Sequence, residues 1–129
     1  MIDFHPDRLG HALLLTREQH EEVIRKGIPI ETCPTSNVMT LELANRFHGK
    51  LVHGLRQHPA LAQWIKASHP IVICTDDPGV FHTTLSKELL LVHEAMDVPL
   101  QHLVAMERNA MKYAFCDEET KEKVGEVWT

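Results

Sequence analysis

The alternation of short apolar segments with helix-like segments is the feature that most constrains the fold of this chain. Residues 71–75 ("IVICT") are predicted to form a strand, and its apolar run suits burial on both faces. Residues 28–34 ("IPIETCP") are predicted to form another strand, and residues 8–12 ("RLGHA") to end an earlier one. Helical segments separate the three, and this order predicts an α/β fold with parallel strands.

Local signals place the helices between and after these strands. Thr16 and Gln19 form a capping-box pattern, and Gly27 lies where a helix should stop, so residues 17–26 are predicted to be helical. The apolar residues that follow Thr84 recur at helical spacing. The other predicted elements are helices over 59–68, 84–96, 97–115 and 118–127, a turn over 35–37, and a short helix followed by a loop over 40–57.

The composition indicates one ordinary globular domain. The 129 residues are enough to bury a core, and 43% of them are hydrophobic while 24% are charged, which argues against disorder. The formal net charge is −5 and no basic cluster occurs, so no nucleic-acid partner is expected.

Two features of the sequence indicate the cellular compartment of the protein. They are its cysteines and its lack of long apolar runs. The chain has three cysteines and no C-x-x-C pair, which favours a reducing environment over a disulfide framework. No apolar run approaches the roughly 18 residues of a membrane span, and the first residues carry no signal core. We therefore expect a soluble, cytoplasmic protein that does not contact membranes.

Polar residues follow each of the three predicted strands. They are His11 after the first strand, Cys33, Thr35, Ser36 and Asn37 at the end of the second, and Asp76 and Asp77 after the third. Ligands bind at the carboxyl ends of strands in parallel α/β folds. These residues therefore predict one site at one rim of the sheet.

The two adjacent aspartates allow two interpretations. One carboxylate can ligate a metal while the other accepts a hydrogen bond from a substrate N–H, because two acids in one pocket need a compensating cation. Alternatively, Asp76 caps the following turn and Asp77 is solvated.

The other polar residues also allow a structural role beside a functional one. His11 is either a structural histidine or a base or electrostatic partner beside a metal-bound water. Ser36 and Asn37 are also typical turn formers. The residues interpreted as structural are Cys33 and Cys74, as packing, and His48, His53 and His58, as loop residues and not a metal cluster.

Together, the segments "DRLGHA", "IPIETCPTSNVMT" and "HPIVICTDDPGVFHTTLSKE" resemble the metal-dependent adenosine and AMP deaminase family. The resemblance is strongest to its adenosine deaminase-like branch, whose substrate is N-methylated AMP. It runs from about residue 7 to the end of the chain and includes "ERNAMKYAF" in a late helix.

The resemblance implies a zinc-dependent hydrolytic deamination of adenosine, AMP or N-methyl-AMP on a TIM-type (β/α)8 barrel, with one zinc ion and a small purine substrate. Asp76 matches the aspartate that ligates zinc and orients the water. Asp77 matches the aspartate that accepts a hydrogen bond from a purine nitrogen. His11 matches the histidine that stabilises the attacking hydroxide, and Ser36 a serine beside the metal carboxylate.

The chain also departs from the family pattern. Ala12 stands in "GHA" where the family has "GHG", and neither the His-x-His pair nor the "HAGE"-like motif is present. The resemblance therefore implies that residues 1–129 are the C-terminal part of the deaminase domain, with about three barrel strands, flanking helices and an incomplete zinc site.

Three functional interpretations follow from this incomplete pattern. The chain is the C-terminal catalytic part of a purine deaminase, or a truncated and inactive family member that associates through open sheet edges. The third is an unrelated metal hydrolase with a site built from His5, His11 and the aspartates. We expect little or no deaminase activity from the chain alone.

Overall fold

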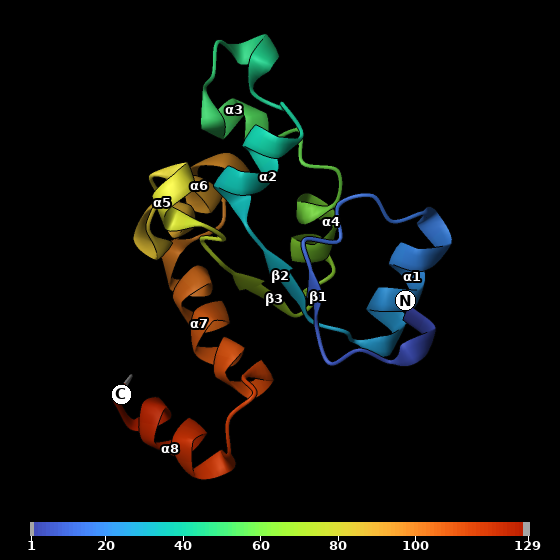
Figure 1. Ribbon diagram of the computed structural model, residues 1–129, viewed down its shortest axis with the longest axis vertical. Coiled ribbons are helices and arrows are strands. Elements are labelled where there is room, and N and C mark those ends of the chain that lie inside the picture. The colour runs from blue at the N-terminus through green and yellow to red at the C-terminus, as the bar shows by residue number, and fades with distance from the viewer. Residues whose placement is uncertain (1, 128–129) are drawn as a thin grey trace.

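The three predicted strands pair side by side in one parallel sheet. The computed structural model describes residues 2–127, and its strands are β1 (Leu9–Gly10), β2 (Ile30–Thr32) and β3 (Ile71–Ile73), in the order β1-β2-β3 (Figure 1). Both pairings are parallel. The predicted α/β class, with three parallel strands and flanking helices, is confirmed.

Helices form the connections and the end of the chain. α1 joins β1 to β2, and α4 leads into β3. Among the described residues, no helix is both long enough and apolar enough to cross a membrane. The helices are α1 (Arg17–Lys26), α2 (Pro34–Thr40), α3 (Leu51–Leu55), α4 (Leu61–Lys66), α5 (Pro78–Phe81), α6 (Leu85–Met96), α7 (Leu100–Ala110) and α8 (Glu118–Val127), with 3-10 turns η1 (Ile2–Phe4), η2 (Asn45–Phe47) and η3 (Met111–Tyr113).

Helix α1 begins and ends where its capping signals predict. The Thr16 side chain accepts a hydrogen bond from the Gln19 backbone N–H, and the Gln19 side chain accepts one from the Thr16 backbone N–H. Gly27 ends the helix with a φ of 64°, in the left-handed region that costs glycine least. These contacts are local, so sequence alone is sufficient to predict them.

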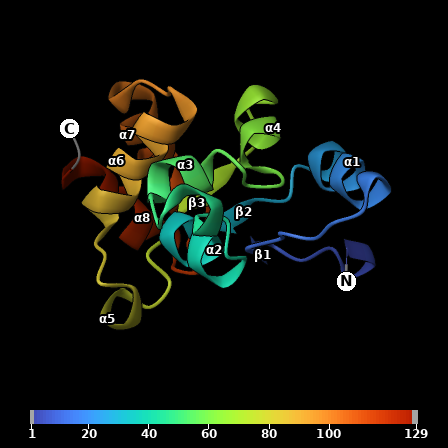
Figure 2. The ribbon, with the colours of Figure 1, turned by 90° about the horizontal axis from the view of Figure 1, so that it is seen from above.

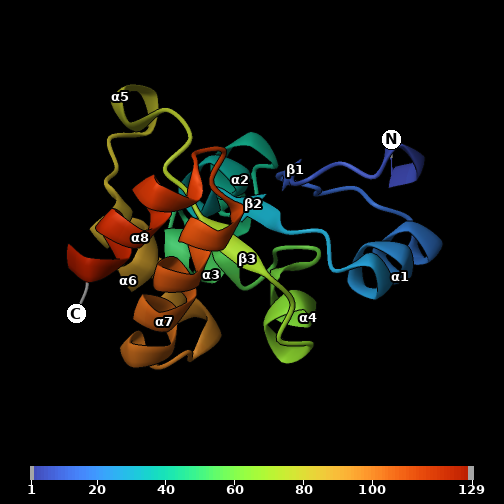
Figure 3. The same cartoon turned by 90° about the horizontal axis from the view of Figure 1, so that it is seen from below.

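One face of the sheet carries the hydrophobic core. Leu9, Ile30 and Ile71 lie opposite one another in the strand register and are all buried. Figures 2 and 3 show α1, α4, α6 and α7 on one side of the strands and α5 on the other. On α4, Leu61 and Trp64 are fully buried and belong to this core.

The opposite face of the sheet is only partly covered. Glu31 and Val72 lie opposite each other on this face and are half-buried, so the predicted burial of the third strand on both faces is wrong. Arg8 pairs with Glu31 at 2.8 Å, donates to the Tyr113 carbonyl oxygen at 2.7 Å, and lies 3.8 Å from the centre of the Phe115 ring. The segment after α7 is thereby held near this face.

Helical structure replaces two predicted irregular segments. Residues 35–37 were expected to form a turn but lie in α2, where Pro34 occupies the first helical turn. Residues 51–55 were expected to be loop but form α3, and the short α5 was not predicted. Gly54 explains the error over α3, because it is needed there for close packing and not for flexibility.

Gly54 packs against α2 and against the segment that follows it. A Cβ at this position would lie 2.7 Å from Val38 Cγ1 and 2.9 Å from Ala44 Cβ. We predict that Gly54→Ala lowers the free energy of unfolding by roughly 1–3 kcal/mol through overpacking. The measurement is urea denaturation followed by circular dichroism.

Gly125 in α8 is the matched control, because no atom lies within 4 Å of a Cβ built there. Gly125→Ala should raise the free energy of unfolding by up to about 1 kcal/mol, through helix propensity alone. Equal changes in the two variants would contradict the close packing of α3.

Candidate active site at the strand ends

The ends of the three strands bring His11, Ser36 and Asp76 together. The Ser36 hydroxyl donates a hydrogen bond to Asp76 Oδ2 at 2.7 Å, and His11 Nε2 lies 3.8 Å from the same oxygen. Ser36 is buried in the first turn of α2, whereas the side chains of His11 and Asp76 are 41% and 39% exposed. The partly exposed side chains of His11 and Asp76 therefore lie next to each other, and the buried Ser36 holds Asp76 in place.

The backbone at this rim adopts a conformation that is uncommon for residues with a side chain. His11, Ala12 and Asp76 have φ angles of 57°, 48° and 58°. This left-handed region is unfavourable for a residue with a Cβ, and such strain is concentrated at functional sites. Ala12 thus occupies a position that favours glycine, which gives a physical basis for the glycine of the "GHG" pattern and makes the alanine of this chain a strained substitution.

The two aspartates take different positions. Asp76 Oδ1 has no hydrogen bond to any residue that the structure describes, so it remains available to a ligand. Asp77 Oδ1 accepts from the backbone N–H groups of Gly79 and Val80, each at 3.1 Å, and so caps α5. The alternative in which Asp76 caps the turn is wrong, because Asp77 does so. The contact of Asp77 with a purine stays a prediction.

One group of potential metal ligands occurs in residues 2–127. His11, Cys33 and Asp76 each offer one ligand atom, and these atoms lie within 4.8 Å of one another. His5 and the histidines at 48, 53 and 58 lie outside this group. Within residues 2–127, the structure therefore does not bring His5 to His11 and Asp76, as the hydrolase interpretation expects. The interpretation of the other three histidines stays a prediction.

Cys33 is a weak member of the group. Its thiol interacts with Cys74, and this hydrogen bond, burial and the nearby Asp76 carboxylate all raise the pKa of Cys33 above its ordinary value. A metal ligand must be the thiolate. The thiol of Cys33 is therefore a poorer ligand than the carboxylate of Asp76.

A buried carboxylate supports the rim from below, and its role was not predicted from the sequence. Glu88 on α6 is fully buried, its Oε2 accepts from the Thr35 backbone N–H at 2.9 Å, and its Oε1 accepts from the Thr83 hydroxyl. It therefore connects the start of α2, which holds Ser36, to the segment after Asp77. A carboxylate also stabilises a helix N-terminus.

Asn37 and His58 extend the site into the interior. One end of the Asn37 amide lies 2.9 Å from His11 Nδ1, and the other end lies 3.1 Å from His58 Nε2. Both Asn37 and His58 are buried. Asn37 was expected at the rim or as a turn former, and His58 as a loop residue. Nothing local in the sequence indicates their contacts over 21 and 26 positions.

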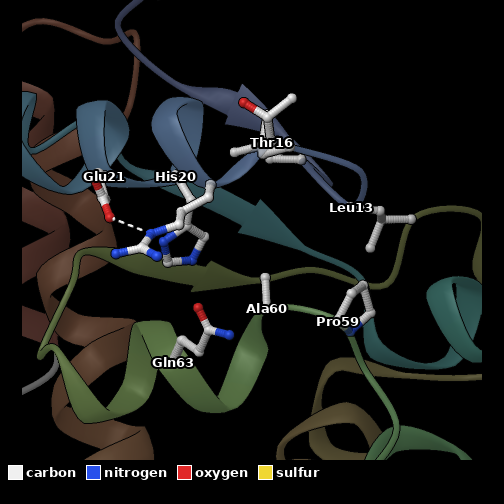
Figure 4. A pocket seen from close by; sticks show the side chains of 10 residues that line it. Leu13, Thr16, His20, Glu21, Pro59, Ala60 and Gln63 are labelled. Carbon is white, nitrogen blue, oxygen red and sulfur yellow. Dashed lines mark hydrogen bonds and ion pairs between the residues drawn. The ribbon is translucent and has the colours of Figure 1, made fainter.

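A separate cavity of about 400 Å³ lies between α1 and α4 (Figure 4). Thr16, His20 and Glu21 face Pro59 and Gln63 across it. His11, Ser36, Asp76 and Asp77 do not line it. The candidate site is therefore assigned to the strand ends by the chemistry of its side chains and not by the shape of this cavity.

Parallel strands with polar residues at their carboxyl ends place this protein in the α/β class, in which candidate sites lie at that edge of the sheet. The sequence pattern of the family described as adenosine deaminase matches residues 1–127. The chain belongs to the adenosine deaminase family.

Relatives in this family are longer than this chain. The chain is 32% identical to the N6-methyl-AMP deaminase-L of Xenopus laevis and 33% identical to the N6-mAMP deaminase of Arabidopsis thaliana. These alignments cover 99% and 96% of the chain but only 35% and 32% of the relatives. The chain thus spans about one third of the length of these proteins.

Solved structures confirm the fold. The apo structure of the Arabidopsis thaliana N6-methyl-AMP deaminase matches with a TM-score of 0.83 and 31% identity, over 99% of this chain and 35% of that one. Arabidopsis ADAL complexed with IMP gives the same TM-score at 30% identity and the same coverage. The three strands and their helices therefore match a portion of a TIM-type barrel.

His58 makes stability depend on pH. Burial lowers the pKa of His58 from 6.5 to about 4. As the pH falls below 6.5, His58 becomes protonated in the unfolded chain but stays neutral in the folded chain. The free energy of unfolding therefore keeps its full value above pH 6.5 and falls between pH 6.5 and 4. We predict a loss of about 3 kcal/mol over this window, measured by urea denaturation at several pH values.

His58→Asn is the control for this loss. The variant should lose most of the pH dependence and keep a smaller part from His69, because burial also lowers the pKa of that histidine. A wild-type chain that is equally stable at both ends of the window would contradict the assignment.

Proposed function

We propose that this chain carries part of the active site of a zinc-dependent deaminase that hydrolyses the exocyclic amino group of a purine. The observation that carries the proposal is the cluster of Ser36, Asp76 and His11 at three strand ends, in a chain that belongs to the adenosine deaminase family. Each of these side chains has the chemistry that the family reaction requires.

Asp76 is the residue proposed to hold zinc. A carboxylate oxygen is a suitable zinc ligand, and Oδ1 is free while Ser36 fixes Oδ2. When bound, zinc would supply a water of lowered pKa for the hydrolysis. Asp76 alone does not complete a zinc site. The remaining ligands are therefore proposed to come from residues outside the strand-end site of this chain.

His11 and Asp77 are proposed to act on the reactants. His11 is in reach of an oxygen held beside Asp76, because its Nε2 lies 3.8 Å from Oδ2 and its ring is partly exposed. Asp77 uses Oδ1 to cap α5, which leaves Oδ2 available for a hydrogen bond with the purine. The cap fixes the carboxylate in place for that contact.

The substrate is proposed to be a purine nucleoside 5′-monophosphate, with N6-methyl-AMP as the first candidate. Support comes from the names of the relatives and from Arabidopsis ADAL structures complexed with IMP and with GMP. Adenosine is the alternative, since no residue of this chain is assigned to a phosphate contact.

Residues 1–129 are proposed to correspond to the C-terminal part of the deaminase domain. The chain covers about one third of its relatives, and its sequence lacks the His-x-His pair and the "HAGE"-like motif. The site is therefore proposed to need a second segment for full zinc affinity and for a general acid.

A second candidate function is association through the sheet edges. Within residues 2–127, β1 and β3 each have one strand neighbour, so each leaves one edge without a strand. Glu107 covers part of the β3 edge, where its carboxylate accepts from the Ile73 backbone N–H at 3.0 Å. Unpaired edges favour pairing with another chain. Light scattering across protein concentrations distinguishes a monomer from such an assembly.

Zinc binding tests the role of Asp76. We predict that the chain binds zinc weakly and that Asp76→Ala abolishes this binding, while Asp3→Ala, a change at an exposed acid in η1, leaves it unchanged. Ser36→Ala should weaken binding roughly 10–100-fold, because it removes the hydrogen bond that orients the carboxylate. Ser86→Ala, on the exposed face of α6, is its matched control.

Competition against a chromogenic chelator measures these affinities. The same samples are assayed for the ultraviolet change as AMP, N-methyl-AMP or adenosine is deaminated, and we expect no turnover by this chain alone. One tightly bound zinc ion per chain with turnover would overturn the proposal that the site is incomplete. Unchanged zinc affinity in Asp76→Ala would overturn the site itself.

A further inference from the structure

The contacts of His58 determine which of its nitrogens carries the proton. Its Nδ1 lies 3.2 Å from the backbone nitrogen of Ala60 and 2.9 Å from that of Leu61, at the start of α4. Both backbone groups are N–H donors, so Nδ1 must accept and cannot carry a proton. The only remaining position for the ring proton is Nε2. Burial, which lowers the pKa of His58, agrees with this neutral form.

The protonated Nε2 of His58 in turn determines how the Asn37 amide is oriented. The amide nitrogen of Asn37 is placed toward His58 Nε2 and its oxygen toward His11 Nδ1. In that orientation the Asn37 NH₂ group and the protonated Nε2 of His58 are both donors and face each other without an acceptor. An asparagine amide has the same outline after a half-turn, so the hydrogen bonds decide between the two orientations. The oxygen must face His58 and the NH₂ group must face His11.

The remaining neighbour of the amide is compatible with this orientation. The Thr32 hydroxyl lies 3.4 Å from the amide position that faces His58. A hydroxyl can donate as well as accept, so Thr32 can donate to an oxygen at that position. No described contact of Asn37 opposes the turned amide.

We propose that His58 and Asn37 are positioning residues that keep the proton of neutral His11 on Nε2, so that His11 presents an N–H donor to the strand-end site. The Asn37 NH₂ group donates to His11 Nδ1 at 2.9 Å and occupies its lone pair. The proton of neutral His11 therefore lies on Nε2, which faces Asp76 Oδ2 at 3.8 Å.

This orientation defines what His11 can do, a consequence that rests on the proposed function. An N–H on Nε2 can donate a hydrogen bond to a negatively charged oxygen held beside Asp76. It cannot ligate zinc through the same atom, because a ligand nitrogen needs a free lone pair. His11 is thereby removed from the group of potential zinc ligands and becomes a hydrogen-bond donor to the attacking oxygen.

Nuclear magnetic resonance of the ¹⁵N-histidine-labelled chain, without zinc or substrate, tests the proposal. Two-bond ¹H–¹⁵N spectra at mildly alkaline pH distinguish a protonated ring nitrogen from an unprotonated one, and His11→Gln and His58→Asn assign the two rings. We expect both His11 and His58 to carry the proton on Nε2. A wild-type His11 protonated on Nδ1, or a His58 protonated on Nδ1, would overturn the proposal.

The substitutions Asn37→Asp and His58→Asn should change which nitrogen of His11 carries the proton, and a purely structural role of these residues would not produce this change. Asn37→Asp replaces the NH₂ donor by an acceptor, so the proton of His11 should move to Nδ1 while His58 stays unchanged. His58→Gln retains a donor toward Asn37 and should leave His11 unchanged. His58→Asn retains only the acceptor that caps α4, so it should release the amide and give a mixture of both His11 forms.

The two proposals fail in different ways. The histidine spectra need no zinc and no turnover, so a missing zinc site leaves them unaltered. If Asn37→Asp leaves the proton of His11 on Nε2, the positioning role is wrong even where zinc binding through Asp76 is established. If Asn37→Asp fails to fold, the wild-type spectrum, with its two rings assigned by His11→Gln and His58→Asn, still decides the matter.

Discussion

Parallel pairing of β1, β2 and β3 in one register is the constraint on which every part of the site depends. The buried row Leu9–Ile30–Ile71 fixes that register, because a slip by one residue would turn apolar side chains toward the open face. The three strand ends then lie next to one another. The Ser36–Asp76 hydrogen bond joins residues 40 positions apart and exists only because of that alignment.

Part of this arrangement could be predicted from the sequence because its causes are local or periodic. The caps of α1 depend on residues within one turn, and the helix after Thr84 depends on apolar spacing. The parallel pairing of the strands follows from their alternation with helices. The cluster of polar residues at the rim follows from the rule that parallel strands end on the same side.

The remainder could not be predicted because it depends on long-range packing. Gly54 is a helix breaker by propensity, yet α3 forms around it because it allows close contact with Val38 and Ala44. Glu88 and Thr35 are 53 positions apart, and the links of Asn37 to His11 and His58 also require the folded chain. The sequence contains ten histidines, but their separate roles depend on burial and on partners.

The central claim is that Asp76 and its neighbours are one part of a deaminase site that another segment completes. Its most direct measurement is the deamination of N6-methyl-AMP by a chimaera that joins this chain to the part of the Arabidopsis thaliana N6-mAMP deaminase that the chain does not match. The account predicts turnover by the chimaera, none by the chain alone, and loss of turnover in the chimaera with Asp76→Ala. A folded, zinc-loaded chimaera without turnover, or turnover that survives Asp76→Ala, would contradict it.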